Sequence, residues 1–400
     1  MKLLRTFLDK QAKYFKKGGK LQRFYPIFEM VDTILYTTGK RTKTRPFVHD
    51  VIDMKRAMIM VVYALIPCSI MALYNTGYQA NAALAGMSDI SNGFWQTQAM
   101  IQLGLPFDPS NILSNIVHGA LFFIPVYFVT IVVGGIWEAL FAVVRKHEIN
   151  EGFLVTSLLF PLICPPAIPY WQVALGISFG VIIGKEIFGG VGMNIFNPAL
   201  MSRAFLFFAY PAQISGNKVW IGVDGLSQAT PLAQLSDPLL ELSYTWREAF
   251  IGLIPGSMGE TSTIACLLGA LVLVVTQIGS WRIMFATLLG LLGTALLFNV
   301  IGSDTNAMFS VSPMWHLALG GYAFAAVFMA TDPVSGTMTT GGKWIYGLLI
   351  GILVVLVRVV NPAFPEGAML AILFMNIFAP IIDKYFINKN IQRRLLRDGQ

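Results

Sequence analysis

The stretch GALFFIPVYFVTIVVGGIWEALFAVV at residues 119–144 decides the fold class, because its only charged residue is Glu138. A transmembrane α-helix needs about 20 predominantly apolar residues, and this run is longer. Similar runs recur along the 400-residue chain, of which 55% is hydrophobic and 12% is charged. Such a chain can bury most of its surface only in lipid. The sequence therefore predicts an all-α polytopic membrane protein.

The apolar runs predict about ten transmembrane helices, some of them short or broken. In windows of about 19 residues, the first five runs lie near 57–74, 119–144, 153–169, 171–188 and 195–211. The second five lie near 263–280, 283–301, 314–331, 344–360 and 367–383. The runs at 153–169 and 195–211 are short for a full crossing, and prolines interrupt the former.

Basic residues predict which side of the membrane each segment faces. Half of the 28 Lys and Arg residues lie in residues 1–56, and the tail 384–400 is also basic. Ten spans with both segments in the cytoplasm satisfy the positive-inside rule and place loop 212–262 outside. The net charge of +7 then favours a role at the membrane surface over nucleic-acid binding. No apolar stretch of the N-terminal segment predicts a cleavable signal peptide.

A short repeat indicates two related halves. The triplet Asn-Pro-Ala opens the fifth run at 197–199 and leads into the tenth run at 361–363. An Asn-Pro pair can cap the start of a helix, with Pro in the first turn. Five spans separate the copies, and an odd number inverts one half relative to the other. We therefore expect a first five-helix repeat at 57–211 and a second, inverted repeat at 263–383.

Four carboxylates fall near the predicted inner ends of spans. They are Glu138, Glu186, Asp332 and Asp383. A charge at membrane depth costs free energy unless it is paired or hydrated. Because oxygen ligands suit a hard cation, the four could form an access region for a transported ion. The alternative is that each one is an ion-paired or capping residue at the interface.

The remaining motifs argue against catalysis by the chain's own side chains. Cys68, Cys164 and Cys266 each lie in an apolar run without a CxxC pair, so buried thiols are expected rather than a metal cluster. Gly134 and Gly135 permit close approach of a neighbouring helix or of a flat ligand. The sequence has no GxxxxGKS, HExxH or GxSxG motif. Any chemistry would belong to a cofactor that the protein holds.

Longer motifs carry a resemblance to one family. They are VRKHEINEGF (144–153), GKEIFGGVGMNIFNPALMSRAFLFFAYPAQISG (184–216), DGLSQATPL (224–232), IPGSMGETST (254–263), FNVIGSDTNAMF (298–309), FMATDPVSG (328–336) and RVVNPAFPEGAMLAILFMNIFAP (358–380). Together they resemble the B subunits of bacterial sodium-translocating NADH:quinone oxidoreductases. The resemblance covers almost the whole chain.

The resemblance implies a covalent flavin on Thr230. In the family, a flavin transferase esterifies the hydroxyl of a threonine in this motif with the phosphate of FMN. The family's pattern is commonly SGAT, and here Gln228 stands where Gly is usual. Because Ala229 and Thr230 are kept and the flanking residues are small, we expect modification in an exposed turn.

The resemblance also implies sites for other ligands, residue by residue. The matching positions for non-covalent riboflavin are Asn194 and Asn197. Those for a ubiquinone or menaquinone are Gly134, Gly135 and Phe153. Those for the sodium path are Glu29, Glu138 and Asp383.

The function implied by the resemblance is export of Na⁺ across a bacterial inner membrane, driven by electron transfer from NADH to a quinone. The partners would be the other members of a six-subunit complex, including an NADH-oxidising subunit with FAD and a 2Fe–2S cluster and a second subunit with covalent FMN. One alternative is the D subunit of the related RNF-type ferredoxin:NAD⁺ oxidoreductase. From another class, a passive solute channel is an alternative because such channels also have paired Asn-Pro-Ala triplets.

Overall fold

The computed structural model describes residues 2–15, 19–26, 28–29, 32, 54–85, 94–145, 152–214, 231–236, 242–361 and 367–398. Regular structure in these ranges is helical, without a β-strand, so the predicted all-α class is confirmed. The predicted flavin acceptor Thr230 lies outside the described residues, together with Gln228.

The first half of the bundle follows α1 (Lys2–Phe15) and the short turn η1 (Gln22–Phe24). It comprises α3 (Met54–Ala85), α4 (Trp95–Gln102), α5 (Ile112–Arg145), α6 (Gly152–Ile163), α7 (Tyr170–Ile182), η2 (Glu186–Phe188) and α8 (Pro198–Ala209). Between the halves, the described residues form the short helices α9 (Pro211–Ile214), α10 (Pro231–Ser236) and α11 (Trp246–Ile251).

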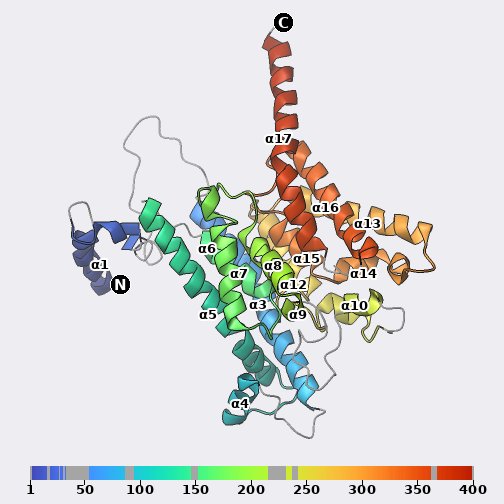
Figure 1. The fold of residues 1–400 in the computed structure, drawn as a ribbon, viewed down its shortest axis with the longest axis horizontal. Helices are drawn as coiled ribbons and strands as arrows, with labels where there is room; N and C mark the ends of the chain where they lie inside the picture. Colours follow the sequence, from blue (N-terminus) through green and yellow to red (C-terminus); the bar gives the residue numbers. More distant parts are fainter. Residues whose placement is uncertain are drawn as a thin grey trace.

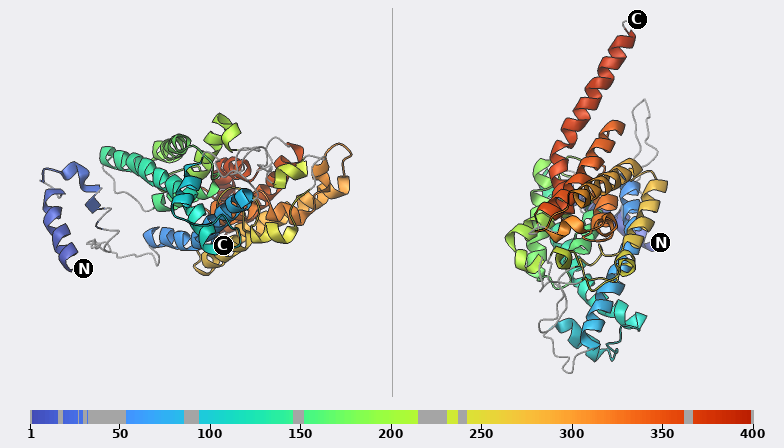
Figure 2. Two further views of the ribbon diagram at one scale, coloured as in Figure 1. Left: turned by 90° about the horizontal axis from the view of Figure 1, so that it is seen from below. Right: turned by 90° about the vertical axis from the view of Figure 1, so that its right-hand side faces the viewer.

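The second half begins with a short helix and ends with two long ones. It comprises α12 (Thr263–Val275), α13 (Trp281–Ile301), η3 (Ala307–Ser310), α14 (Pro313–Ala318), α15 (Tyr322–Phe324), the π-helical segment η4 (Ala325–Met329), α16 (Thr340–Val360) and α17 (Ala368–Asp398). The long helix α17 rises out of the bundle at the top of Figure 1, and α4 lies at the opposite end. The right-hand view of Figure 2 shows from the side that α17 extends beyond the bundle.

Each predicted apolar run contains helix, but not every run forms one long helix. Within the described ranges, α3, α5, α13, α16, α17 and the segment Tyr170–Phe188 are long and apolar enough to cross a bilayer. The helices α6, α8 and α12 are apolar but shorter. The run at 314–331 is divided into α14, α15 and η4. At the C-terminus, α17 continues without a break to Asp398, so the predicted tail is an extension of the tenth helix.

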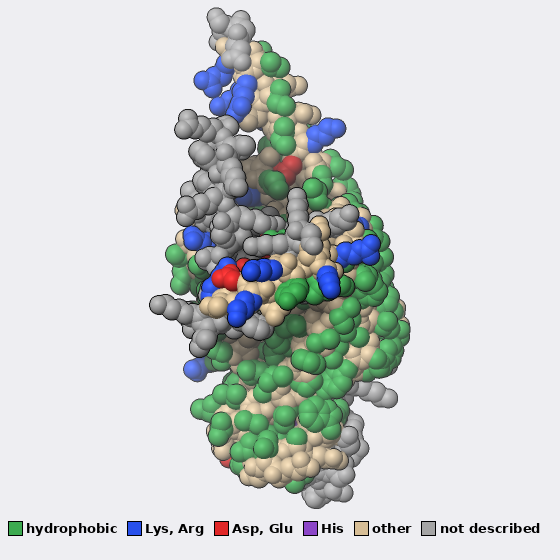
Figure 3. Space-filling model, turned by 90° about the vertical axis from the view of Figure 1, so that its left-hand side faces the viewer, with side chains coloured by type: hydrophobic (Ala, Val, Ile, Leu, Met, Phe, Trp, Pro, Cys, Tyr) green, Lys and Arg blue, Asp and Glu red, His purple; other side chains and the backbone are tan. Residues whose placement is uncertain are grey.

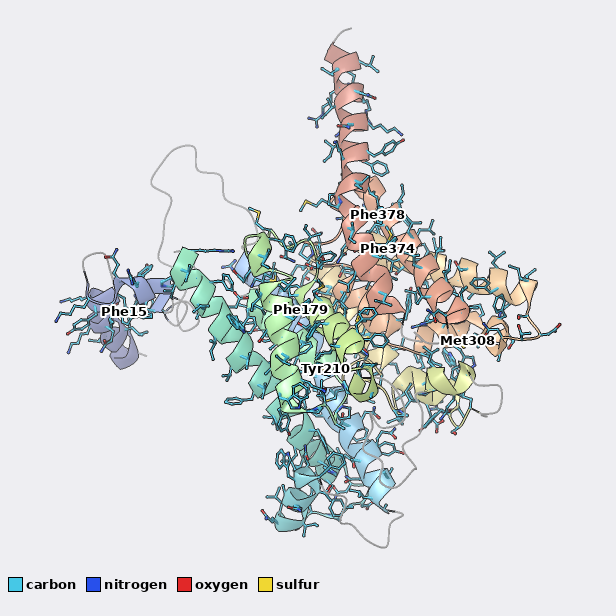
Figure 4. The ribbon with its side chains drawn as sticks, viewed as in Figure 1. Phe15, Phe179, Tyr210, Met308, Phe374 and Phe378 are labelled. Atoms are coloured by element: carbon cyan, nitrogen blue, oxygen red, sulfur yellow. The ribbon has the colours of Figure 1, made fainter. Side chains whose placement is uncertain are left out.

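The flank of the bundle is apolar, as lipid contact requires. In Figure 3 hydrophobic side chains cover most of the described surface of the lower bundle, whereas Lys and Arg side chains are concentrated higher up. Phe374 and Phe378 of α17, labelled in Figure 4, are 51% and 38% exposed. Exposed aromatic rings on a helix of this kind are expected to face acyl chains.

The two halves share several helix–helix contacts. In the first half α3 and α5 both contact α6, α5 contacts α7, and α8 contacts α6 and α7. In the second half α12 and α13 both contact η4, α13 contacts α16, and α17 contacts η4 and α16. The halves meet where α3 contacts α12 and where α8 contacts α17. These shared contacts are expected of two related repeats, but α3 packs against α5 whereas α12 and α13 form no comparable contact.

Glycine and a buried arginine explain the broken eighth span. Gly320 and Gly321 have φ values of 65°, a left-handed conformation that glycine adopts without steric cost. The fully buried guanidinium of Arg358 donates hydrogen bonds to the carbonyl oxygens of His316, Leu319 and Gly320 at 2.7, 2.9 and 3.0 Å. A helix end inside a membrane protein needs such partners for its free carbonyl groups.

Candidate functional site

A cavity of about 70 Å³ lies where the two halves meet. Its wall includes Met58 and Val61 of α3, Leu273 of α12, and Gly152, Val155, Thr156 and Leu159 of α6. Lys185, Asn194 and Asn197 line it from the segment before α8, and Phe328, Thr331 and Asp332 line it from the end of the eighth span. We call this space the inner cavity. It brings both predicted riboflavin residues to one pocket with apolar walls and a few polar groups, a composition typical of a cofactor site, although its volume is below the roughly 300–1,000 Å³ of most ligand pockets.

Asn197 has two structural tasks and one free donor. Its side-chain oxygen caps α8, accepting from the backbone N–H groups of Ala199 and Leu200 at 3.0 and 3.3 Å. Pro198 follows at the first helical position, as the sequence predicted. The amide Nδ2 donates to Asp332 Oδ2 at 3.4 Å. An asparagine amide carries two hydrogens, so among the described contacts one stays available to a ligand.

Asn194 adds a second set of polar groups beside the Asn197 amide. Its Nδ2 donates to the carbonyl oxygen of Phe196 at 2.9 Å, and the side chain is 8% exposed. One amide hydrogen and the side-chain oxygen are then available in the described contacts. The two asparagines thus present donors and an acceptor to the inner cavity. The ring edge of a flavin carries carbonyl and imide groups, so the residues present fit this class of ligand.

In the second Asn-Pro-Ala triplet, at 361–363, the asparagine ends a helix, whereas Asn197 caps the start of one. Asn361 ends α16, and its backbone N–H donates to Val357 O at 3.1 Å. The next residues of the triplet, Pro362 and Ala363, lie outside the described residues. Of the two triplets, the structure therefore describes a helix-opening cap only at Asn197.

Asp332 joins the two halves across the inner cavity. Besides Asn197, it accepts from the Ser335 hydroxyl at 2.8 Å and from the backbone N–H of Val334 at 3.1 Å. These bonds fix the turn that follows η4 against the start of α8. A π-helical segment such as η4 often occurs at functional sites. Asp332 is therefore a supporting residue for Asn197 at this cavity.

A buried ion pair adjoins the inner cavity on its α5 side. Lys185 Nζ pairs with Glu138 Oε1, and both side chains are 4% exposed. Glu186 Oε1 lies 4.0 Å from Lys185 Nζ, and Glu186 Oε2 lies 3.6 Å from Arg145 Nη1. Glu138 and Glu186 are thus ion-paired residues, which was the alternative to an ion-access region. The sequence analysis did not assign their cationic partners to a site.

Gly134, Gly135 and Phe153 come together, as predicted for one site. A methyl group built at Gly134 would lie 2.5 Å from Phe153 Cζ, so the ring of Phe153 fills the space beside this glycine. At Gly135 the nearest atom, Phe153 Cε1, would be 3.8 Å away. Gly134 is buried and Gly135 is half-buried. Helix packing therefore explains Gly134, while Gly135 retains room at its surface.

The predicted sodium residues occupy separate places. Asp383 accepts from the backbone N–H groups of Met338 and Thr339 at 2.8 and 2.9 Å, and from the Thr339 hydroxyl. Glu29 lies in the N-terminal segment and is 6% exposed. Within the described ranges, no three His, Cys, Asp or Glu side chains are grouped to hold a metal ion. Asp383 therefore stabilises the start of α16.

A second, outer cavity of about 30 Å³ lies beside Pro231, the residue after Thr230. Its other lining residues are Leu232, Ile254, Pro255, Gly256, Ser257, Glu260, Thr261, Ala318, Leu319, Gly320 and Gly321. Glu260 Oε2 accepts from Arg203 Nη1 at 2.8 Å, and the two side chains are 12% and 5% exposed. Sequence analysis missed this pair because its members lie on separate segments.

The two cavities lie toward opposite ends of α16. Val334, which precedes this helix by six residues, lines the inner cavity, and Gly320, whose carbonyl oxygen accepts from Arg358 near the end of the helix, lines the outer cavity. The first turn of α16 contacts Asp383, from which α17 continues into the basic extension. Its last turn contacts Asn306, which donates to Val359 O at 2.7 Å, and α10 packs against η3 beside this point. Met308 of η3 is labelled there in Figure 4. At 1.5 Å per residue, α16 spans roughly 30 Å, the thickness of a hydrocarbon core.

The cysteines are buried thiols, as predicted. Cys68 Sγ of α3 and Cys266 Sγ of α12 lie 3.9 Å apart where the halves meet. Cys164 is also free and buried.

These features define a class: a polytopic helical membrane protein of two similarly packed halves, with broken helices around polar cavities. A model of the NQR2, RnfD, RnfE family matches residues 41–392. The chain is 55% identical over 401 residues to the B subunit of the Na(+)-translocating NADH-quinone reductase from Ectopseudomonas mendocina, covering 99% of both chains. It is 54% identical over 399 residues to the protein of the same name from Chromohalobacter salexigens, covering 99% of this chain and 97% of the relative. The chain therefore belongs to the NQR2, RnfD, RnfE family.

Proposed function

We propose that this chain is the membrane subunit of a respiratory sodium pump that passes electrons from NADH, oxidised on another subunit, to a quinone and exports Na⁺. The observation that carries the proposal is the inner cavity, where Asn194 and Asn197 meet Asp332 of the other half. Full-length identity of 55% to a member of a sodium-translocating NADH-quinone reductase supports it.

Riboflavin is the cofactor proposed for the inner cavity, where it would supply reversible redox chemistry. Asn197 offers one amide hydrogen, and Asn194 offers an oxygen and an amide hydrogen, to the polar edge of its ring. Asp332 keeps the Asn197 amide in place, and Phe328 and Leu159 supply apolar walls that exclude water. Three hydrogen bonds hold the Asn197 side chain and one holds that of Asn194, which reduces the side-chain entropy lost when a ligand binds.

Covalent FMN on Thr230 is the second proposed cofactor. The threonine hydroxyl would form a phosphoester with FMN through a separate flavin transferase. Its neighbour Pro231 lies toward the end of α16 opposite the basic extension, which supports placing Thr230 on the periplasmic side. A tether of this kind gives the flavin a high local concentration without a nucleotide-binding fold.

Along the eighth span, Gly321 lines the outer cavity and Phe328 lines the inner one. Seven residues of helix rise roughly 10 Å, which is the shortest separation of the two cavities along this span.

A quinone is proposed to approach the half-buried face at Gly135, beside Phe153. Glu29, Glu138 and Asp383 are proposed for the sodium path, and Glu138 must separate from Lys185 before it can bind an ion. The other proposed partners are the remaining members of a six-subunit complex in the bacterial inner membrane, among them an NADH-oxidising FAD and 2Fe–2S subunit and a second subunit with covalent FMN. Both termini of the chain are proposed to be cytoplasmic.

The first experiment separates a redox subunit from a passive channel. The chain, expressed with its maturation machinery, is run on a denaturing gel under ultraviolet light. A fluorescent band that is lost in Thr230→Ala and kept in the control Thr245→Ala supports the proposal. A chain without the band would favour the channel.

The second experiment tests the inner cavity. Riboflavin is extracted from the purified complex and quantified for the wild type, Asn194→Ala and the control Asn299→Ala, whose side chain bonds to Phe309 O and Val311 O away from the cavity. Loss of riboflavin only in Asn194→Ala supports the site. Equal riboflavin content in all three would refute it.

A further inference from the structure

Lys185 is the one lysine among the residues that line the inner cavity. Its side chain is 4% exposed, and its described ion-pair partners are Glu138 and, at 4.0 Å, Glu186. A buried ammonium group costs several kcal/mol of desolvation free energy unless it is paired. The pair with Glu138 explains how Lys185 is tolerated, but it does not explain why a cation lines the cavity.

A cation at the wall of a redox pocket has an electrostatic effect on its ligand. Charges interact strongly in a site of low dielectric constant, so a nearby ammonium group stabilises a ring that has gained an electron. Glu138 opposes this effect, because its carboxylate neutralises the same ammonium group. The free energy of a reduced ligand would thus depend on how Lys185 is shared between the ligand and Glu138.

We propose that Lys185 is the charge-compensating residue of the inner cavity, which stabilises the negative charge of a reduced flavin ring and shares its ammonium group between that ring and Glu138. The inference rests on the proposed binding of riboflavin in this cavity. Reduction of the ring weakens the Lys185–Glu138 pair, since the ammonium group then has a second anionic partner. Oxidation of the ring restores the pair.

The electron balance is simple. One electron from the preceding redox centre of the complex adds to the ring, and its charge is compensated by an ammonium group that is already present. No bond is made or broken in this step. If the ammonium group of Lys185 interacted more strongly with the reduced ring, it would neutralise the carboxylate of Glu138 less. This would make Glu138 a better cation ligand in the reduced state than in the oxidised state.

The test is a redox titration of bound riboflavin in the whole purified complex, comparing each variant with the wild type. Lys185→Gln removes the ammonium group and is expected to weaken binding of the reduced ring about tenfold relative to the oxidised ring. For a one-electron couple a tenfold change equals about 59 mV, here toward lower potential. Glu138→Gln frees the ammonium group from its carboxylate and shifts the potential in the opposite direction.

The control is Arg145→Gln, which removes a cation beside Glu186 that does not line the cavity. Its expected shift is much smaller than that of Lys185→Gln. Because Glu138→Gln leaves a buried lysine without its carboxylate and could impair folding, the double variant Lys185→Gln with Glu138→Gln provides a neutral pair. Its potential is expected to lie close to that of the wild type.

The outcomes distinguish this inference from the proposed function. A wild-type complex without riboflavin would overturn the cofactor assignment itself. Riboflavin retained at an unchanged potential in Lys185→Gln would overturn only the role of Lys185. Equal shifts in Lys185→Gln and Arg145→Gln would also overturn it, because the effect would then be a general one of net charge. A structural role alone would not give shifts of opposite sign for the two members of the pair.

Discussion

Substitution of Gly134 by alanine tests the contact between α5 and α6 at one methyl group. The new Cβ would lie 2.5 Å from Phe153 Cζ, 2.6 Å from Phe153 Cε2 and 3.1 Å from Ile177 Cγ1. Overpacking of this kind costs about 1–3 kcal/mol. Alanine recovers about 1 kcal/mol through its higher helix propensity. We therefore expect Gly134→Ala to lower the free energy of unfolding by up to about 2 kcal/mol.

Gly135→Ala is the matched control, since its Cβ would meet Phe153 Cε1 at an ordinary 3.8 Å. The assay is the thermal unfolding midpoint of the purified protein in detergent, measured for both variants and for Gly134→Ala combined with Phe153→Leu. In the combined variant, the smaller leucine side chain should restore part of the decrease in the unfolding midpoint. Equal midpoints for Gly134→Ala and Gly135→Ala would refute the packing argument.

A substitution at Gly135 tests ligand binding separately from helix packing. A leucine at Gly135 is expected to raise the KM for quinone, or to reduce inhibitor sensitivity, with little change in the unfolding midpoint. Normal quinone kinetics in Gly135→Leu would remove this position from the quinone site.

Three further predictions concern single side chains. Asn197→Ala should cost about 1 kcal/mol through loss of the α8 cap and also deplete riboflavin, as measured by unfolding and by flavin extraction; unchanged values would contradict its double role. Glu138→Ala should destabilise the protein by about 3–5 kcal/mol, because it leaves Lys185 buried without its carboxylate. The same variant should weaken sodium stimulation of quinone reduction. Unchanged sodium dependence would exclude Glu138 from the ion path. Hydrogen bonds from the Thr245 backbone and hydroxyl lower the pKa of Glu248, so the α11 cap is intact above the carboxyl's ordinary pKa and is lost as pH falls through the lowered value. Hydrogen exchange in α11 should accelerate at that lower pH, and pH-independent protection would contradict the capping box.

The sequence predicted the helical runs well because a membrane span must satisfy its backbone internally and present apolar side chains. The same physics explains the short helices, since prolines and the Asn197 cap act locally. The break at Gly320 was not predicted, because it depends on Arg358 from a distant helix. A local pattern does not contain such a contact. Continuation of α17 past Asp383 was also missed, because a drop in hydropathy ends the apolar run without ending the helix.

The candidate site was predictable only in part. Asn194 and Asn197 followed from the resemblance, and the structure places both at the inner cavity. The grouping of Gly134 with Phe153 likewise needed the fold to bring α5 against α6. Lys185 was not assigned to a site, since nothing in the surrounding sequence shows that it pairs with Glu138 across 47 positions. Long-range ion pairs of this kind become visible only when the helices are packed.

The central claim is that this chain carries a redox flavin on Thr230, on the periplasmic side of the inner membrane. The intact mass of the polypeptide, expressed with its native maturation machinery, tests it most directly. We predict the mass of the chain plus one FMN minus one water, and the unmodified mass for Thr230→Ala. A wild-type chain with no adduct, or an adduct that persists in Thr230→Ala, would contradict the account.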